Sequence, residues 1–480
     1  MFQKISYNLG IAAISRFIVG AIGLVVIGFL TRSLGPAGYG YYNLIFAYLF
    51  IFSTVADLGL YTILVREISK VDSGEEKIIA SKLFTLRFIV AVLVLIAADL
   101  LVFALPYPFL VKLGILIASL FSIFSSLTQV LTGIFQKHLR LYLVSFADVI
   151  SRASQLALLI VLIYLKAGLL MFVGAAVFSE IIHFLLTLLF SKSLTRVGIS
   201  VDFKYWGETL KIALPIAASL VFVLIYFKLD TVLLSLMKPA YDVGVYSIAY
   251  KILEAVIFLP AIYVGLVMPL LSRHAFGDRP EFIKTFRKAF NVLSVFALPL
   301  AAYIFVLSGE IIRIVGGSGF APAGPVLKIL SIAILMIFFG NLGGNAIVAL
   351  NLQKKGMWIY LAGAVFNVVA NLILIPRYSY FATAWTTVAT EILITFWMFW
   401  LIKKETGTAA EKTIFPKAIL ASAIMLVIMW PFFGNFVLAT AAAVSYFPIL
   451  FLLGGFTKDD LREIFSLKKT PAVPEEIESQ

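Results

Sequence analysis

Apolar segments of about 20 residues, separated by short polar stretches, recur along the chain as far as residue 456. A helix needs about 20 apolar residues to cross a hydrocarbon core of roughly 30 Å, and about fourteen segments satisfy this length. The pattern therefore predicts an all-α polytopic membrane protein with about fourteen transmembrane helices. The predicted spans are 9–31, 41–64, 83–105, 109–132, 143–165, 169–190, 211–236, 243–271, 289–308, 326–349, 356–376, 380–402, 415–433 and 436–456.

Composition supports this interpretation. Hydrophobic residues make up 62% of the 480 residues and charged residues 13%, and the mean hydropathy is +1.05. A soluble globular domain is about half apolar and a quarter charged, and no loop here is long enough to hold one. There are no cysteines and only three scattered histidines, so we expect no disulfide, metal site or cofactor.

Positive charge alternates between the loops. If the N-terminus is cytoplasmic, the loops on that side hold 25 lysines and arginines and the loops on the other side hold 6. Cytoplasmic loops of membrane proteins carry this excess, so the net charge of +13 does not require a nucleic-acid partner. We therefore expect an even number of spans in the cell (inner) membrane, with both termini cytoplasmic.

A short internal repeat divides the chain. Residues 34–47 read LGPAGYGYYNLIFA and residues 237–250 read MKPAYDVGVYSIAY. Both contain Pro-Ala and then Gly-x-Tyr before an apolar helix, which is typical of a parallel repeat about an axis normal to the membrane. We expect two pseudo-symmetric six-helix halves, 1–190 and 211–402, joined by a cytoplasmic linker at 191–210. Helices 13 and 14 would occupy 403–456, followed by a disordered cytoplasmic tail at 457–480.

Charged residues inside the predicted spans are the main candidates for function. Each costs at least about 2.5 kcal/mol at bilayer depth, so such residues usually face the bundle interior or a wet cavity. Spacing of three or four residues predicts helix-face pairs for Asp148–Arg152, Lys251–Glu254 and Glu180–His183. The full set is Arg16, Asp57, Arg87, Asp99, Asp148, Arg152, Glu180, His183, Lys228, Asp230, Lys251, Glu254, Lys328 and Glu391.

The position of a charged residue within its span also suggests what its side chain contacts. Arg87 and Lys328 lie near span ends and are expected to extend to the interface. Lys228 and Asp230 are two residues apart and should find different partners.

A cationic cavity is the first hypothesis for a binding site. Arg16 and Lys251 lie well inside their spans, and two cations facing one cavity would bind a phosphate or pyrophosphate. Arg152 is a third candidate for the same headgroup site. The alternative is structural pairing, with Arg16 and Lys251 bound to Asp57, Glu180 or Glu391 on other helices and Arg152 to Asp148.

Buried carboxylates suggest a second role. A carboxylate that alternates between a proton and a cation can couple transport to a proton or sodium gradient. Asp57, Asp148, Glu180 and Glu391 are the candidates, and the sequence does not choose among them.

Helix breakers and amides within the spans also matter. Pro260 and Pro299 should kink their helices. Asn367 and Asn371 can bond across helices or contact a sugar. The more polar segment 309–325 suits a short interfacial helix.

Several strings resemble the Wzx-type oligosaccharide flippases of the polysaccharide transporter family, within the MOP superfamily. The resemblance runs from the first predicted span to the twelfth. The strings are TRSLGPAGYGYYN (31–43), ADLGLYTILVREIS (56–69), DTVLLSLMKPAYDVGVYSIAYKI (230–252), the Pro269 to Arg273 end of span 8, and NVVANLILIPRYSYFATAWTTVATE (367–391).

The resemblance implies an inner-membrane carrier with two six-helix halves around a cationic cavity. It implies transport of an undecaprenyl- or dolichyl-pyrophosphate oligosaccharide from the cytoplasmic to the outer leaflet by alternating access, for polysaccharide biosynthesis. Related lipid II flippases carry functional arginines early in spans 1 and 8, positions that Arg16 and Lys251 match. The partners implied are the lipid-linked oligosaccharide, membrane lipids and a polysaccharide polymerase, with the carrier a monomer.

Three alternatives remain. A multidrug exporter of the same superfamily would need no spans 13 and 14 and would favour an acidic cavity. A lipid II flippase for peptidoglycan is the second, and the short loops and the string at 230–252 favour the oligosaccharide branch over it. A membrane glycosyltransferase or polymerase needs catalytic residues on long loops, which this chain lacks, so we do not expect an enzyme.

Overall fold

The computed structural model describes residues 2–57, 59–275, 277–407 and 414–455, without the side chains of 2–14, 16, 73, 212 and 214–227. Within these ranges all regular elements are helices, as predicted. They are α1 (Phe2–Asp57), α2 (Leu60–Ile68), α3 (Ser73–Ala104), α4 (Phe109–Lys137), α5 (Leu141–Tyr164), α6 (Leu169–Ser191), α7 (Phe203–Met237), α8 (Ala240–His274), α9 (Arg279–Gly316), α10 (Ala323–Ala349), α11 (Gln353–Thr406), α12 (Phe415–Met429), α13 (Phe436–Ala443) and α14 (Tyr446–Leu452).

The two longest helices each form two membrane-length legs. A straight helix of 56 residues, the length of α1, would measure about 84 Å. α1 is interrupted at Gly35, whose φ of 63° is a left-handed conformation that favours glycine. α11 is interrupted at Ser379, whose φ is 50°. The four legs correspond to the predicted spans 9–31, 41–64, 356–376 and 380–402.

Ten helices in the described part of the chain are long and apolar enough to cross a membrane, α1 and α11 among them. α7 covers the predicted span 211–236. Together with the two legs of α1 and of α11 and the α13–α14 segment, these helices account for all the predicted spans.

Three elements differ from the prediction. The second span ends early at Asp57, and Gly59, with a φ of 68°, begins the separate helix α2. The segment expected as an interfacial helix at 309–325 instead continues α9 to Gly316, followed by a 3-10 turn at Ser318–Phe320. The last predicted span consists of two short helices, α13 and α14, because the helix is interrupted at Val444 and Ser445.

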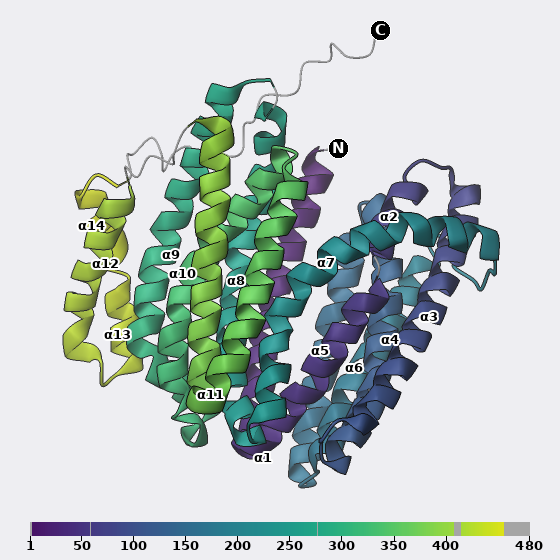
Figure 1. Ribbon diagram of the computed structural model, residues 1–480, viewed down its shortest axis with the longest axis horizontal. Coiled ribbons are helices and arrows are strands. Elements are labelled where there is room, and N and C mark those ends of the chain that lie inside the picture. Colours follow the sequence, from purple (N-terminus) through teal and green to yellow (C-terminus); the bar gives the residue numbers. More distant parts are fainter. Residues whose placement is uncertain (1, 58, 276, 408–413, 456–480) are drawn as a thin grey trace.

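The helices form two groups (Figure 1). The second leg of α1 packs with α3, α4 and α6 through Ile45, Leu49, Leu95 and Val111. α8, α9, α10 and α11 form the other group, and α12 to α14 lie on its outer side against α9. The first leg of α1 contacts α8, where Phe17 meets Phe258 edge to face at 5.5 Å.

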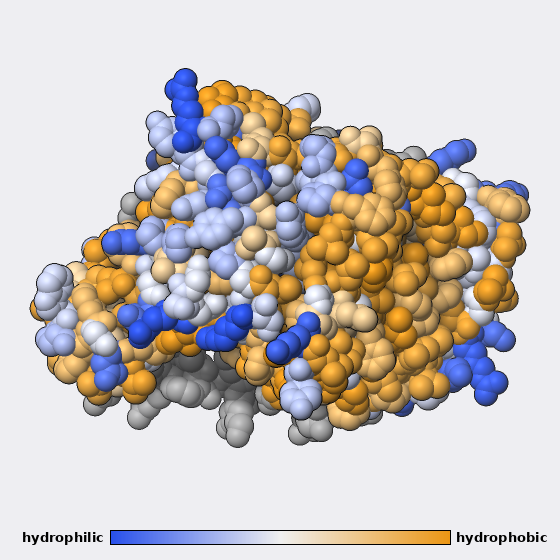
Figure 2. All heavy atoms as spheres, turned by 90° about the horizontal axis from the view of Figure 1, so that it is seen from below, coloured by the Kyte–Doolittle hydropathy of each residue, from blue (hydrophilic) through white to orange (hydrophobic). Residues whose placement is uncertain are grey.

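The flanks of the bundle are apolar. Figure 2 shows hydrophobic residues covering much of the flank that belongs to the first group of helices. Leu93 and Leu100 of α3 are among the exposed residues, at 62% and 70%. In a soluble protein such exposure would be costly, whereas hydrocarbon chains solvate it well.

The segment before α7 is bound to α3. Backbone N–H groups of Gly198 and Ser200 donate to the hydroxyls of Ser81 and Thr85, at 3.0 and 2.9 Å. The hydroxyl of Thr195 donates to the buried carboxylate of Glu76. The predicted linker therefore lies along the first group of helices.

The start of α7 is attached to the same surface. Asp202 caps α7 by accepting from the N–H of Tyr205 at 3.0 Å and pairs with Lys82 at 2.7 Å. The Lys82 hydrogen bond and the Tyr205 N–H lower the pKa of the Asp202 carboxyl. The indole N–H of Trp206 donates to the carbonyl of Lys82 at 3.0 Å.

The two repeated strings meet where α1 crosses α8. A Cβ added at Gly40 would lie 1.8 Å from the carbonyl oxygen of Ala240, and one added at Gly244 would lie 1.9 Å from that of Pro36. The contact is reciprocal, since each glycine of the repeat faces the Pro-Ala of the other copy. Arg32 adds a second link by donating to the carbonyls at the end of α9, with 2.7 Å to Ile314.

Candidate functional site

A small polar cavity lies between the two groups of helices. Asn43 and Ala47 of α1, Lys228 and Thr231 of α7, and Ser247, Tyr250 and Lys251 of α8 line it. Its volume is about 10 Å³, enough for roughly one water molecule. The residues of the first repeated string therefore face those of the second across this cavity.

Glu254 holds the two lysines of the cavity together. Its carboxylate accepts from the ammonium group of Lys228 through one oxygen and from that of Lys251 through the other, the latter at 2.7 Å. The predicted pair Lys251–Glu254 is confirmed. Lys228 also lies over the ring of Tyr250, 5.4 Å from its centre.

The sequence analysis did not place Lys228 beside Lys251 in one cavity. Its partner Glu254 is 26 residues away on the next helix, so spacing along one helix does not reveal the pair. The available signal was a lysine well inside a predicted span with no acidic residue on its own helix face.

Arg152 approaches from the other group of helices. It lies on α5, 3.6 Å from Asp148 and 3.2 Å from the amide oxygen of Gln155. The predicted Asp148–Arg152 pair is thus confirmed, and both side chains are about one-third exposed. The phenol of Tyr42 lies within electrostatic reach of both Arg152 and Lys251.

Arg16 is placed only by its backbone. It belongs to the first leg of α1, and its side chain lies outside the described residues. The adjacent Phe17 contacts Phe258, one helical turn beyond Glu254 on α8.

Arg87 is buried rather than interfacial, contrary to the prediction. Its side chain is only 2% exposed and pairs with Asp57 at 2.5 Å. It also donates to the carbonyl of Ala56 and to the side chains of Ser126 and Gln129. A buried guanidinium needs partners for its five N–H groups; Ala56 and Asp57 supply them at the end of α1, and Ser126 and Gln129 supply them from α4. Asp57 is therefore the counterion of Arg87.

Glu180 lies apart from the cavity on α6. It is 6% exposed and 3.7 Å from His183, as its spacing predicted.

A second polar cluster surrounds Asp230, two residues after Lys228. The buried Asp230 carboxylate accepts from the amide of Asn371 at 2.8 Å, the hydroxyl of Thr387 at 3.0 Å and that of Tyr246 at 3.3 Å. Asn371 donates in turn to Asn367. The Asp230 hydrogen-bond donors among the described residues are all neutral, so this carboxylate differs from Asp57 and Glu254.

Glu391 lies on α11 within electrostatic reach of Asp230, and both are almost fully buried. Within the described residues no group of three or more histidine, cysteine or acidic side chains could hold a metal. Two neighbouring buried carboxylates with neutral oxygen and amide neighbours form an environment that can take up a proton or a small cation.

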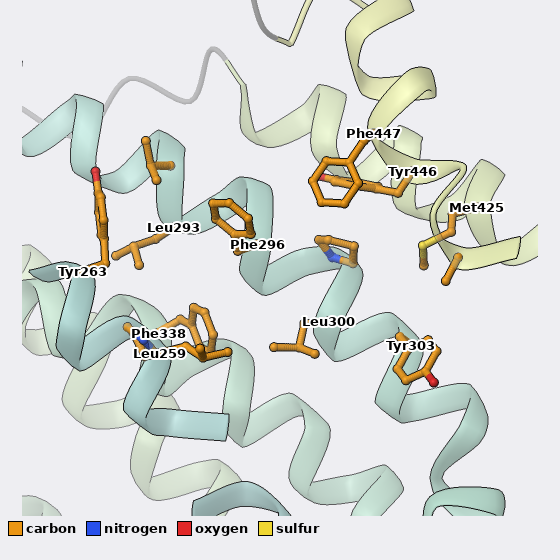
Figure 3. Close-up of a pocket in the computed structure, with 14 residues that line it drawn as sticks. Leu259, Tyr263, Leu293, Phe296, Leu300, Tyr303, Phe338, Met425, Tyr446 and Phe447 are labelled. Carbon is orange, nitrogen blue, oxygen red and sulfur yellow. The ribbon is translucent and has the colours of Figure 1, made fainter. Parts of the chain in front are cut away.

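An apolar pocket lies between α8, α9, α10 and the final helices (Figure 3). Phe296 and Leu300 of α9 line one side, and Met425, Tyr446 and Phe447 line the other. Its volume is about 450 Å³. Pro260 and Pro299, for which the sequence predicted kinks, also border it. The pocket can hold a hydrocarbon chain but offers little to a charged group.

Sequence comparisons give two family matches. The model described as polysaccharide biosynthesis protein matches residues 5–275. The model described as MatE matches residues 215–373.

Two relatives carry functional names. The chain is 23% identical over 401 residues to the putative O-antigen transporter of Shigella flexneri, covering 79% of this chain and 93% of that one. It is 25% identical over 171 residues to the probable flippase AglR of Haloferax volcanii, covering 35% of this chain and 36% of that one. The chain thus spans little more than a third of AglR.

The fold matches solved transporters. The lipid II flippase MurJ in its inward closed conformation superposes with a TM-score of 0.78 at 16% identity, covering 94% of this chain and 99% of that one. At this identity the match establishes the fold alone.

Proposed function

The chain belongs to the polysaccharide biosynthesis protein family and is a membrane transporter of the MOP superfamily, and from this premise we propose that it flips a lipid-linked oligosaccharide. The substrate class is an undecaprenyl- or dolichyl-pyrophosphate oligosaccharide. The direction is from the cytoplasmic to the outer leaflet by alternating access, for polysaccharide biosynthesis.

The single observation that carries this proposal is the cationic cavity between the helix groups. Lys228 and Lys251 are both held there by one carboxylate. Arg152 and Lys251 both lie within electrostatic reach of the phenol of Tyr42. A pyrophosphate needs several donors and positive charges, which these three side chains supply. Arg16 is the fourth member of the proposed headgroup site.

The apolar pocket supports a lipid substrate. Its lining is almost entirely hydrocarbon and aromatic, and it is bordered by α12 and α14, which lie against α9. We assign it to the polyprenyl tail, while the headgroup occupies the cationic cavity.

The Asp230 cluster supports coupling to an ion gradient. We propose that Asp230 and Glu391 exchange a proton or a sodium ion during the cycle, because their neighbours offer oxygen atoms. Asp57, Asp148 and Glu180 are weaker candidates, since each has a cationic or histidine partner.

We further propose that the protein lies in the cell membrane with both termini cytoplasmic and acts as a monomer. A polysaccharide polymerase is the proposed partner that consumes the flipped lipid.

The match to MatE leaves a multidrug exporter as the second candidate, but lysines in the cavity would repel cationic drugs. A lipid II flippase differs from the proposal only in the sugar and peptide carried.

Reconstitution tests the proposal. Full-length protein in proteoliposomes should move a fluorescent undecaprenyl-pyrophosphoryl N-acetylglucosamine between leaflets, measured by the fraction that a membrane-impermeant reductant bleaches. We expect Lys251→Ala and Arg16→Ala to slow flipping at least about tenfold, since each removes a charge-assisted hydrogen bond. Flipping at the wild-type rate by both variants would refute the headgroup assignment.

A further inference from the structure

Glu254 occupies the place that a substrate anion would take. Its two carboxylate oxygens bind different lysines, from α7 and α8. The cavity that these lysines line has a volume of about 10 Å³, far less than a pyrophosphate needs. A pyrophosphate bound to both lysines would therefore have to displace this carboxylate.

The charge balance explains why a carrier would keep such a carboxylate. A transporter that delivers its cargo must return empty, and the binding site then passes through a closed state inside the membrane. Unpaired cations at this depth are costly. A carboxylate on the same helix as one of the lysines can offset one of their two charges and accept hydrogen bonds from both whenever the cargo is absent.

We propose that Glu254 is an internal substitute for the pyrophosphate, which binds the ammonium groups of Lys228 and Lys251 and offsets one of their two charges during the empty return, and is displaced when the lipid-linked substrate binds. This inference rests on the proposed flippase function and specifies how its site is regulated. Arg152 of the opposing helix group also has a carboxylate partner, Asp148, at 3.6 Å on its own helix.

The proposal predicts that loss of Glu254 affects net flipping and lipid exchange differently. Net flipping requires the empty return, whereas exchange of a labelled lipid for an unlabelled one does not. Replacing Glu254 by glutamine removes the internal anion and leaves the lysines free for substrate. Binding should therefore become tighter and exchange should persist, while net flipping should fail.

The experiment uses the full-length chain in proteoliposomes with fluorescent undecaprenyl-pyrophosphoryl N-acetylglucosamine. Net flipping is measured with the probe in one leaflet, and exchange with saturating unlabelled lipid in both. For Glu254→Gln we expect net flipping to fall at least about tenfold, exchange to stay within about twofold of wild type, and inorganic pyrophosphate to bind about tenfold more tightly. Glu254→Asp should recover part of the net flipping.

Glu310→Gln is the matched control. Glu310 also pairs with a cation three residues away on its own helix, Arg313 at 2.6 Å, but it lies outside the cavity. Its net-to-exchange ratio should equal that of wild type. If Glu254→Gln cannot be purified folded, Lys228→Met/Glu254→Gln replaces it, because one lysine without a carboxylate carries the same net charge as the two lysines with Glu254. Its net-to-exchange ratio should stay close to that of wild type, and a tenfold fall in this ratio would overturn the charge-balance argument.

The outcomes distinguish the two claims. If wild type moves no probe, the flippase proposal fails and the role of Glu254 fails with it. If wild type flips the probe and Glu254→Gln retains normal net flipping, or loses net flipping and exchange equally, the flippase function stands and the substitute role is overturned.

Discussion

Gly40 of α1 and Gly244 of α8 lie back to back, each against a backbone carbonyl of the other helix. A Cβ on either would approach a carbonyl oxygen to less than 2 Å, a distance that no packed structure tolerates. The two copies of the internal repeat thus hold the helix groups together through backbone contact.

Gly40→Ala should force this crossing apart. Overpacking of this kind costs typically about 1–3 kcal/mol. The natural chain has no cysteine, so a single Val243→Cys reports the separation through its rate of labelling by a membrane-impermeant maleimide. Val243 is 1% exposed, and we expect its labelling to accelerate several-fold in the Gly40→Ala background. Gly20→Ala, with nothing within 4 Å of the added Cβ, should leave the rate unchanged.

Lys228→Met should weaken substrate binding as much as Lys251→Met does. Each removes one charged donor, which is worth about 1.5–3 kcal/mol, or roughly 10- to 100-fold in affinity. Because both lysines share Glu254, the double variant should cost less than the sum of the two single changes. Lys328→Met is the control, since Lys328 is exposed and lies over Phe305. Additive losses in equilibrium binding would contradict a shared site.

Asp230→Asn should uncouple transport from the driving ion. The substitution keeps the size and removes the charge that a proton or cation must neutralise. Flipping should lose its dependence on an imposed sodium or pH gradient, measured in proteoliposomes with each gradient in turn. Asp99→Asn changes a carboxylate on α3 that accepts from Ser119 and should keep the wild-type dependence. A gradient response that survives Asp230→Asn would exclude Asp230 from coupling.

Leu300→Trp should discriminate substrates by tail length. Leu300 lines the apolar pocket (Figure 3), and a tryptophan there would occupy part of its 450 Å³. Flipping of a 55-carbon polyprenyl pyrophosphate should slow several-fold, whereas a 15-carbon analogue should be affected little. Equal slowing of both lipids would mean that the pocket does not hold the tail. Leu93→Trp, on an exposed flank, is the matched control.

The Asp202 carboxylate should stabilise the fold over a defined pH range. Its pKa in the folded protein is lowered by Lys82 and the α7 N–H groups. The contribution is therefore fully present above the unfolded pKa of about 3.9 and is lost as the pH falls through the lower folded value. The difference in Tm between wild type and Asp202→Asn should be constant from about pH 5 to 8 and shrink below about pH 4. A difference that changes between pH 6 and 8 would have another source.

The span pattern was readable from the sequence because lipid imposes a length and a composition on each helix. The pairs Asp148–Arg152 and Lys251–Glu254 followed from helical spacing, which is a local rule. Pairs between residues on different helices could not be predicted in this way. Asn371 and Thr387 lie 141 and 157 residues from Asp230, so no pattern within one helix could connect them.

Arg87 is a residue whose surroundings were predicted wrongly because its partners lie on other segments of the chain. Its place near a span end suggested the interface, but the break at the end of α1 supplies a carbonyl and a carboxylate that bury it. The polar contacts at such helix breaks depend on tertiary structure, so the hydropathy of the sequence does not predict them.

α7 connects two surfaces that belong to different helix groups. Trp206 near its start is bonded to Lys82 of α3, and Asp230 near its end is bonded to Asn371 of α11. The 24 residues between them span about 36 Å as a helix. While both attachments and the helix remain intact, these two points cannot move farther apart than this length. Any rearrangement that moves the two groups of helices apart must therefore keep these anchors within this distance, or break one of the attachments or the helix.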